Sequence, residues 1–256
     1  MTLEGKVVLV AGAGGLLGRA IVKSVCEEGG KVIAADIDEE TLSSWIKEAG
    51  FTGDQVIGST LDITEADSIN AAFDLGREKW GQVNAAVNTS YPRNKNYGKK
   101  FFDVAYADFC ENVSLHLGGY FLFMQQCAKE AMTQGIPFSL VNLSSIYGVI
   151  APKFSVYEDT EMTMPVEYAA IKSGLLHLNR YLTAEMKGTG FRVNSVSPGG
   201  ILAGQPESFL EKYKSHCSSK GMLDVDDVVG SVNFLLSDKS KYVSGQNLIV
   251  DDAFSV

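Results

Sequence analysis

Residues 6–18 read KVVLVAGAGGLLG, and this stretch decides the fold of the chain. Its first six residues form a short, valine-rich run, which predicts a buried β-strand. Gly12, Gly15 and Gly18 follow in a turn, and the helical pattern of residues 17–28 continues directly from it. Glycines in such a strand–turn–helix unit let the backbone approach a pyrophosphate, and the helix N-terminus offers N–H groups to its phosphates. The stretch therefore predicts a dinucleotide-binding turn.

Strand-like and helix-like segments alternate along the rest of the chain. Further strands are expected at 31–36, 56–61, 83–88, 138–144, 191–197 and 247–250. Helices are expected at 39–49, 64–80, 108–133 and 166–187, with two more after residue 200. Near-continuous apolar strands separated by helices predict a parallel sheet that is covered on both faces. Because no linker or repeat interrupts the pattern, we expect residues 1–256 to form one α/β domain, a doubly wound Rossmann fold with a seven-stranded parallel sheet.

Composition excludes several classes of protein. The net charge of −9 argues against nucleic-acid binding and against a role at membrane surfaces. No stretch approaches the roughly 20 apolar residues of a membrane span, so we expect a cytoplasmic protein. The four cysteines lie far apart, without metal-ligand spacing, which is typical of reduced thiols. We therefore expect a small-molecule substrate and no metal ion.

Asp36 ends the second expected strand, where a carboxylate can accept hydrogen bonds from an adenosine ribose. The same carboxylate would repel the 2′-phosphate of NADP, so this position favours NAD as the cofactor. Arg19, on the helix after the glycine turn, is a cation that would soften this preference if it reached the same place. The simpler alternative for Asp36 is an aspartate that ends a strand or caps the next helix.

Tyr168 and Lys172 lie four positions apart on an expected helix and therefore share one face. An ammonium group beside a phenol favours the phenolate, which brings the proton exchange of the tyrosine closer to neutral pH. Ser145, at the end of a strand, offers a hydroxyl that can hold a substrate oxygen. Tyr91 and Lys95 repeat the spacing in a proline-containing loop, so the spacing alone also fits an ordinary surface pair.

These residues together resemble the short-chain dehydrogenase/reductase family over essentially the whole chain. The resemblance implies that Ser145 orients the substrate oxygen and that Tyr168 is the general acid/base in a hydride-coupled proton transfer. It implies that Lys172 lowers the pKa of the tyrosine and holds the nicotinamide ribose. Besides the turn glycines and Asp36, it implies further cofactor-binding positions, which are Leu17, Asp62, Ile63, Asn88, Pro198, Gly199 and Ile201.

The chain departs from the family pattern at three places. The spacing of the turn glycines is that of the extended branch of the family, which handles nucleotide-sugars, whereas the chain length belongs to the short branch. Residues 89–91 read Thr-Ser-Tyr instead of Asn-Ala-Gly, so the bulky Tyr91 is expected near the mouth of the site. His116 stands where the family usually carries an asparagine. It is expected either to be a core histidine bonded to a backbone carbonyl or to join a proton relay through Lys172 and water.

Two insert-like loops, 91–103 and 151–165, are expected at the carboxyl edge of the sheet, where such folds bind ligands. Arg93, Lys95 and Lys99 in the first loop form a local positive patch that either is simply solvated or recognises a phosphate or carboxylate.

The second loop carries Tyr157 and several carboxylates, which suit the hydroxyl groups and ring faces of a sugar-like substrate. Alternatively, this loop serves only contacts between subunits. Residues 201–222 are expected to form a mobile lid over cofactor and substrate.

The sequence as a whole predicts an NAD-dependent oxidoreductase that interconverts a secondary alcohol and a ketone on a small, anionic or sugar-like substrate. Residues 91–98 and 157–168 resemble the subgroup found with bacterial surface-sugar and flagellin-modification biosynthesis. The alternatives are a nucleotide-sugar epimerase or dehydratase, and a non-catalytic dinucleotide-binding regulator. By resemblance, helices 108–133 and 166–187 would form a homodimer or homotetramer interface, with His177 in that interface or in the core.

Overall fold

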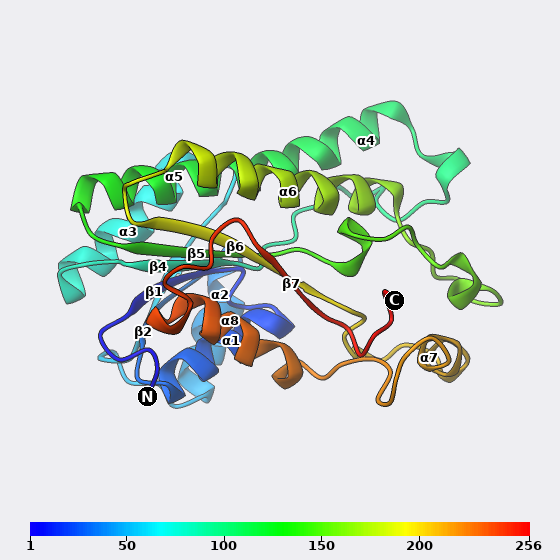
Figure 1. Ribbon diagram of the computed structural model, residues 1–256, viewed down its shortest axis with the longest axis horizontal. Helices are drawn as coiled ribbons and strands as arrows, with labels where there is room; N and C mark the ends of the chain where they lie inside the picture. The colour runs from blue at the N-terminus through cyan, green and yellow to red at the C-terminus, as the bar shows by residue number, and fades with distance from the viewer.

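A seven-stranded parallel sheet runs through the molecule in the computed structural model, which describes residues 1–256 (Figure 1). The strands are β1 (Val7–Ala11), β2 (Lys31–Asp36), β3 (Val56–Thr60), β4 (Ala85–Asn88), β5 (Phe138–Leu143), β6 (Phe191–Pro198) and β7 (Asn247–Val250). Their order across the sheet is β3-β2-β1-β4-β5-β6-β7, and every neighbouring pair is parallel. The predicted fold class and number of strands are therefore confirmed.

Eight helices accompany the sheet, and their order along the chain follows the prediction. They are α1 (Leu16–Glu27), α2 (Glu39–Glu48), α3 (Ala66–Trp80), α4 (Tyr106–Asn112), α5 (Gly119–Gln134), α6 (Val166–Glu185), α7 (Glu207–Lys214) and α8 (Asp226–Leu236). Helix α3 starts two residues later than expected, because the backbone and hydroxyl groups of Thr64 both bond to Asp62 instead of capping the helix.

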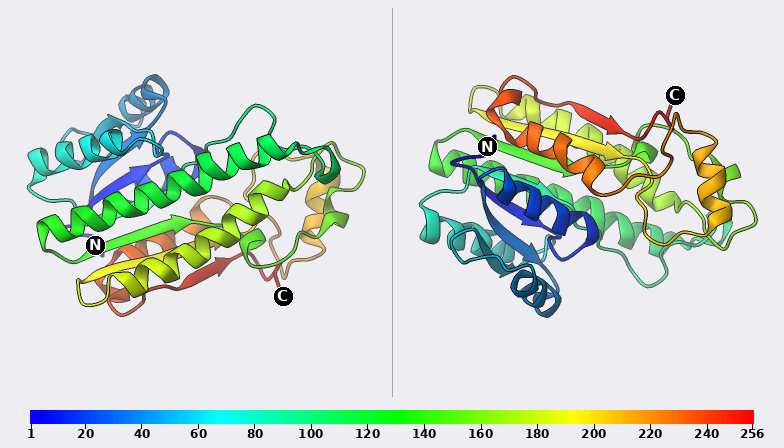
Figure 2. Two further views of the ribbon diagram at one scale, coloured as in Figure 1. Left: turned by 90° about the horizontal axis from the view of Figure 1, so that it is seen from above. Right: turned by 90° about the horizontal axis from the view of Figure 1, so that it is seen from below.

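Alternate residues of the strands belong to two separate hydrophobic cores. Val7, Leu9 and Ala11 of β1 belong to one apolar cluster with residues of α3, α5 and α6, whereas Val8 and Val10 belong to another with residues of α1, α2 and α8. This follows from the period of two in a strand, which sends successive side chains to opposite faces of the sheet. The two helical layers are visible above and below the sheet in Figure 1 and from both sides in Figure 2.

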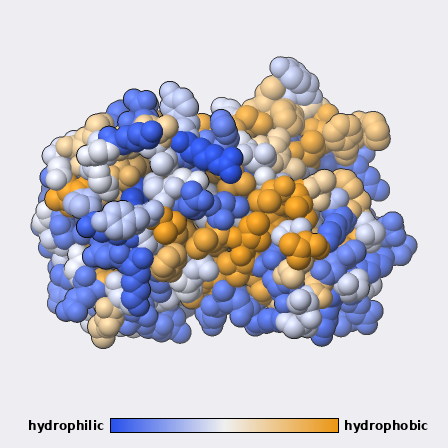
Figure 3. All heavy atoms as spheres, viewed as in Figure 1, coloured by the Kyte–Doolittle hydropathy of each residue, from blue (hydrophilic) through white to orange (hydrophobic).

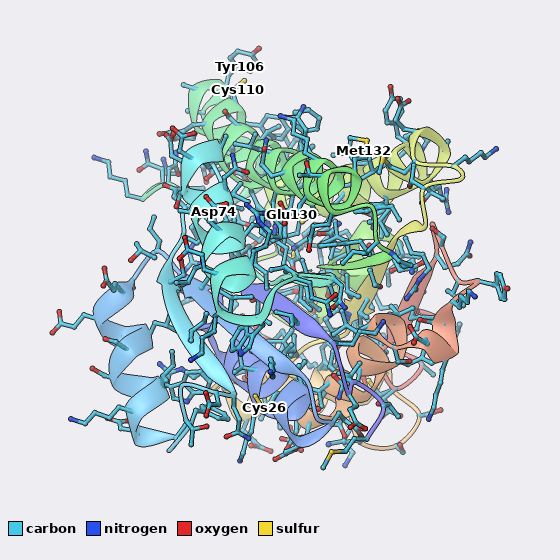
Figure 4. All side chains as sticks on the ribbon, turned by 90° about the vertical axis from the view of Figure 1, so that its left-hand side faces the viewer. Cys26, Asp74, Tyr106, Cys110, Glu130 and Met132 are labelled. Atoms are coloured by element: carbon cyan, nitrogen blue, oxygen red, sulfur yellow. The ribbon has the colours of Figure 1, made fainter.

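The long helix expected at 108–133 is present, but one of its turns is wider than an α-helical turn. Helices α4 and α5 are joined by a π-helical turn, η2 (Val113–Gly118), which contains His116, and the three pieces form one rod in Figure 1. Such π-turns insert an extra residue into a helix and occur frequently at functional sites. Farther along the rod, Glu130 of α5 pairs with Arg77 of α3, which also pairs with Asp74 (Figure 4).

The order in which the chain adds strands reverses between β1 and β4. The strands β2 and β3 lie on one side of β1, and β4 and the later strands lie on the other side. In doubly wound sheets ligands bind outside the carboxyl ends of the strands at this switch point. The glycine turn after β1, the segment after β4 and the ends of β5 and β6 all lie at this edge. The topology therefore brings the predicted site residues to one place.

The surface carries polar and apolar regions. On the face shown in Figure 3, apolar residues gather where the C-terminus and α7 lie in Figure 1. Exposed apolar residues near the chain end include Ile249 and Val256. None of the helices combines the length and the apolar character needed to cross a bilayer. All four cysteines are free thiols, including Cys26 and Cys110 (Figure 4).

The packing of α3 on the sheet can be tested at Gly76. A methyl group there would lie 2.6 Å from Val83 Cγ2 and 2.8 Å from Ile33 Cδ1, so Gly76→Ala should lower the free energy of unfolding by about 1–3 kcal/mol. A methyl group at the exposed Gly230 of α8 meets nothing within 4 Å, so Gly230→Ala should raise stability by about 0.5–1 kcal/mol. Urea unfolding measures both, and changes of the same sign in the two variants would contradict this packing.

Candidate active site

The glycine turn is held against the ends of β2 and β4. Gly12 has a φ of +79°, which favours glycine, and a side chain there would come within 2.6 Å of Thr89 Oγ1. A side chain at Gly18 would lie 2.1 Å from the carbonyl oxygen of Gly12. Thr89 Oγ1 donates to the carbonyl oxygens of Ala11 and Gly12, at 2.9 and 3.0 Å. The glycines are therefore required by close packing of the turn on its neighbours.

The turn and the first turn of α1 fit a dinucleotide pyrophosphate. Gly15 is the N-cap of α1, and no side chain caps this end of the helix, which leaves the N-terminal N–H groups and the helix dipole for an anion. The N–H of Gly14 donates to Asp36 Oδ2 at 2.9 Å, and Arg19 Nε donates to the carbonyl oxygen of Gly14 at 2.8 Å. Asp36 and Arg19 are therefore both bonded to the backbone of Gly14 in the glycine turn.

The other residues that were predicted to bind the cofactor differ in their surroundings. Asp62 accepts two hydrogen bonds from Thr64 through Oδ1, and Ile63 is buried. Asn88 is buried, its Oδ1 accepts the N–H of Ser90, and its Nδ2 has no partner. A further set lines the main cavity of the protein, namely Leu17, Pro198, Gly199 and Ile201.

Ser145, Tyr168 and Lys172 meet at the floor of that cavity, as predicted. Ser145 follows β5 and caps a short 3₁₀ turn (Ile146–Gly148), where its hydroxyl oxygen accepts the N–H of Tyr147. Tyr168 and Lys172 lie on the same face of α6, and Lys172 Nζ is 5.5 Å from the centre of the Tyr168 ring. Lys172 Nζ also donates to the carbonyl oxygen of Leu143 at 2.8 Å, so the buried ammonium group is anchored to the end of β5.

Burial governs the protonation of this group of residues. Burial raises the pKa of Tyr168 to about 12, although hydrogen bonding to Ser145 opposes the shift. Burial lowers the pKa of Lys172 to about 7. The expected lowering of the Tyr168 pKa by Lys172 is therefore not found in this structure. Burial disfavours the charged form of each residue, so it raises the pKa of the tyrosine and lowers the pKa of the lysine.

Tyr91 belongs to the site, although its spacing with Lys95 has no catalytic meaning. Its ring lies edge-on to Tyr168 at 5.7 Å and to His116 at 5.1 Å between ring centres. Its hydroxyl donates to the hydroxyl of Tyr97 at 2.8 Å. The expectation of a bulky side chain near the site is met, since Tyr91 lines the cavity next to Tyr168.

His116 is 1% exposed and packs between the rings of Tyr91 and Tyr120. Neither ring nitrogen has a hydrogen-bond partner within the protein, so the expectation of a histidine bonded to a backbone carbonyl is wrong. Burial, assisted by the charges of Lys172 and Arg93, lowers the pKa of His116 to about 2. The imidazole is therefore neutral, and its part in a proton relay stays a prediction.

The cavity has a volume of about 630 Å³ and an aromatic, almost uncharged lining. Lys172 is the one charged residue among the residues that line it. Six tyrosines line it, namely Tyr91, Tyr97, Tyr147, Tyr157, Tyr168 and Tyr213. Of these, the sequence analysis assigned substrate binding to Tyr157 and missed Tyr97, Tyr147 and Tyr213. The one available signal was the pair of tyrosines, Tyr91 and Tyr97, in the first insert-like loop, whereas Tyr147 and Tyr213 stand singly in their segments.

The predicted cationic residues of the first loop do not line the cavity. Arg93 stacks on the ring of Tyr91 at 4.8 Å, Lys99 pairs with Asp108 at 3.5 Å, and Lys95 is exposed. The loop is held in this place because Asn94 and Asn96 both donate to Asp108 of α4. Recognition of an anion by this loop stays a prediction for a substrate that extends beyond the cavity.

The chain resembles known proteins over its full length. The family described as enoyl-(acyl carrier protein) reductase matches residues 12–255. Post-translational flagellin modification protein A of Campylobacter coli is 43% identical over 256 residues, which cover 99% of this chain and 100% of that protein. Zerumbone synthase of Zingiber zerumbet is 31% identical over 275 residues, which cover 100% of this chain and 97% of that protein. A crystal structure of a short-chain dehydrogenase from Leptospira borgpetersenii with bound NAD+ is 28% identical, with a TM-score of 0.84, over 100% of this chain and 94% of that one.

The buried, neutral state of His116 predicts a pH-dependent stability. Because its pKa is lowered from 6.5 to about 2, the unfolded chain binds a proton as the pH falls below about 6.5, whereas the folded protein does not. Relative to His116→Asn, the wild type should lose up to about 1.4 kcal/mol of unfolding free energy per pH unit below that value. Urea unfolding between about pH 8 and 5 measures this difference. His177→Asn on the exposed side of α6 is the control and should follow the wild type, while parallel curves for His116→Asn would contradict a neutral imidazole.

Proposed function

The chain belongs to the short-chain dehydrogenase/reductase family, and on this premise we propose that it interconverts a secondary alcohol and a ketone on a small, hydroxylated ring, with NAD as the preferred cofactor. The coarser activity, oxidoreduction with a nicotinamide dinucleotide, follows from the family. The observation that carries the proposal is the meeting of Ser145, Tyr168 and Lys172 at the floor of one cavity beside Pro198 and Gly199.

The reaction needs a group that moves a proton while a hydride moves. A nicotinamide held beside Pro198 and Gly199 would supply the hydride acceptor for an alcohol or the hydride donor for a ketone. In the reducing direction Tyr168 donates its phenolic proton to the ketone oxygen, which Ser145 holds by a hydrogen bond. The phenolate that remains lies beside Lys172, whose positive charge stabilises it at this moment. In the oxidising direction the same groups act in reverse, and Tyr168 takes the proton of the alcohol.

The preference for NAD rests on Asp36. Its carboxylate is fixed by the N–H groups of Gly14 and Asp38, at 2.9 and 3.2 Å. A carboxylate held at the end of β2 accepts ribose hydroxyls and repels a 2′-phosphate. Arg19 is held by the carbonyl oxygen of Gly14 and by stacking on Trp45 at 5.5 Å, so its charge is partly committed to these contacts.

The cavity favours a neutral, hydroxylated substrate part. The only charged residue of the lining is Lys172, which is buried and already donates to Leu143, so an anion inside the cavity would lose its hydration for contact with at most one cation. In the pairs Tyr91–Tyr97 and Tyr157–Tyr147 one hydroxyl donates to the other, which leaves the proton of the accepting hydroxyl for a third partner. Sugar-like rings offer acceptors for such protons and faces that pack on aromatic rings.

Two further observations bear on the biological setting. A relative that is 43% identical over the full chain is named for flagellin modification, which supports a substrate from surface-glycan or flagellin modification. The homodimer or homotetramer also stays a proposal, supported by exposed apolar side chains on α5 and α6. These are Phe121, Met132 (Figure 4) and Tyr181.

Removal of the Tyr168 hydroxyl tests the reaction. Tyr168→Phe should lower kcat by about 10²–10⁴, because the phenol that moves the proton is lost, while NAD binding persists. The measurement is NADH formation from a panel of cyclohexanol, cyclohexane-1,2-diol, myo-inositol, hexoses, hexose phosphates and nucleotide-sugars. Tyr181→Phe, an exposed tyrosine of the same helix, is the matched control and should keep wild-type turnover.

The same panel separates the alternatives. The proposed site should oxidise neutral polyols with a lower KM than their phosphates, and Lys95→Ala should leave these values unchanged. Conversion of a nucleotide-sugar without net NADH release would support an epimerase or dehydratase instead. Full turnover by Tyr168→Phe would refute the catalytic assignment, and NAD binding without turnover of any alcohol or ketone would support a regulator.

Replacement of Asp36 tests the cofactor preference. Wild-type protein should bind NADH more tightly than NADPH, and Asp36→Ala should shift the ratio of the two dissociation constants by about tenfold or more, equivalent to about 1.4 kcal/mol. The variant would lack the negative charge that repels the 2′-phosphate. Fluorescence titration with both reduced cofactors measures the ratio. Equal affinities in the wild type, or no shift in the variant, would contradict a role for Asp36.

A further inference from the structure

The last six residues form a C-terminal tail (residues 251–256) that lies next to α7 at the carboxyl edge of the sheet (Figure 1). The chain leaves β7 through Asp252 and Ala253, which have φ values of +50° and +65° although neither is glycine. Residues with side chains adopt this region at a cost in free energy. The carboxylate of Asp251 offsets that cost, because it accepts the N–H groups of Ala253 and Ser255 at 3.1 and 2.8 Å.

Asp252 holds the loop that follows α7. Its carboxylate accepts the N–H groups of Ser219, Lys220 and Gly221 at 3.0, 2.6 and 2.8 Å, and the Ser219 hydroxyl at 2.9 Å. Its carbonyl oxygen accepts the N–H of Ser218 at 2.8 Å. These bonds lower the pKa of Asp252 to about 2, the bond from Gly221 having the largest effect. A single residue of the tail therefore bonds to four consecutive residues of the expected lid.

Phe254 packs on two of the tyrosines that line the cavity. It is 0% exposed and stacks on Tyr213 of α7, with ring centres 4.2 Å apart and planes 13° apart. Its ring also meets Tyr147 edge-on at 6.4 Å. Lys153, in the second insert-like loop, donates to the carbonyl oxygen of Phe254 at 2.6 Å and lies 4.6 Å from the centre of its ring. Tyr147 and Tyr213 line the cavity, whereas Phe254 does not.

The tail also contacts the bend expected beside the nicotinamide. The N–H of Gly199 donates to the carbonyl oxygen of Val250 at 2.8 Å, and a side chain at Gly199 would meet Asp251 at 3.0 Å. The N–H of Gly200 donates to the hydroxyl of Tyr213 at 2.6 Å. The bend, α7 and the tail are therefore packed together beside the cavity.

We propose that the C-terminal tail is a positioning element, in which Asp252 and Phe254 hold α7 over the cavity and so determine substrate binding without touching the substrate. Without these contacts, α7 would be held by the pairing of Gly200–Leu202 with Leu223, by the bonds of Lys212 to Glu158 and Asp159, and by the side-chain packing of Phe209 and Tyr213. The effect on substrate binding rests on the proposed function, whereas the restraint on residues 203–221 does not depend on that function.

Limited proteolysis of the full chain tests the restraint without any substrate. Trypsin can cut after Lys212, Lys214 and Lys220, and Asp252→Ala should speed cleavage there by about tenfold, because the closed segment opens more often. The cleavage rate of Asp252→Asn, which keeps an acceptor oxygen, should lie between the rates of the wild type and of Asp252→Ala. Asp238→Ala is the matched control, because Asp238 pairs with Lys6 and makes no bond to the tail or to α7. Cleavage at the wild-type rate, or equal acceleration at sites throughout the chain, would overturn the proposal.

Kinetics test the consequence for the site, with the panel alcohol that the wild type oxidises fastest as the probe. Phe254→Ala should raise the KM of this alcohol by about tenfold and change kcat and the NADH dissociation constant little, whereas Phe254→Leu, which refills most of the space, should have a smaller effect. Phe234→Ala, on a partly exposed residue of α8, is the control. A fall in kcat alone, or equal loss of NADH affinity, would overturn the proposal. If the wild type oxidises no alcohol, the proposed function fails, and proteolysis alone decides the restraint.

Discussion

The constraint on which the rest of the structure depends is a parallel sheet buried on both faces. Because all seven strands point the same way, their carboxyl ends meet at one edge, and each connection must return through a helix. The glycine turn after β1, Asn88 at the end of β4, Ser145 after β5 and the bend after β6 are thus neighbours in space, although up to about 190 residues apart in sequence. Alternate apolar residues of the strands bind the two helical layers that keep this edge in register.

Burial at this edge sets the chemistry. Tyr168, Lys172 and His116 are enclosed by aromatic rings, and in each case the charged form is disfavoured. The lysine remains next to the tyrosine because α6 approaches the turn after β5 closely. A side chain at Gly148 would lie 2.8 Å from the Lys172 backbone. A site with little stable charge of its own responds strongly to the charge that appears when a proton moves, because the surrounding dielectric is low.

The tyrosines that line the cavity with Tyr168 come from separate loops and short helices of the chain. Tyr91 and Tyr97 come from the first insert-like loop, Tyr147 and Tyr157 from the chain between β5 and α6, and Tyr213 from α7. Their positions depend on side-chain contacts to fixed elements, such as Asn94 to Asp108 of α4, and Tyr213 to Phe254 of the C-terminal tail. The reaction and its substrate range are therefore determined by different parts of the molecule.

The sequence by itself determined the fold, the glycine turn, Asp36 and the Ser145, Tyr168 and Lys172 positions, because strand and helix periods and short motifs are local properties of the chain. It also pointed to Tyr91 and His116 as unusual. Only the tertiary structure decided that His116 has no partner, that Arg93 and Lys99 turn to Tyr91 and Asp108, and that the cavity is walled by tyrosines. The role of the last six residues was also invisible, since Asp252 and Phe254 contact residues far away in the sequence, such as Gly221 for Asp252 and Tyr147 and Tyr213 for Phe254. Such contacts depend on how irregular segments pack at the sheet edge, which no local period or motif encodes.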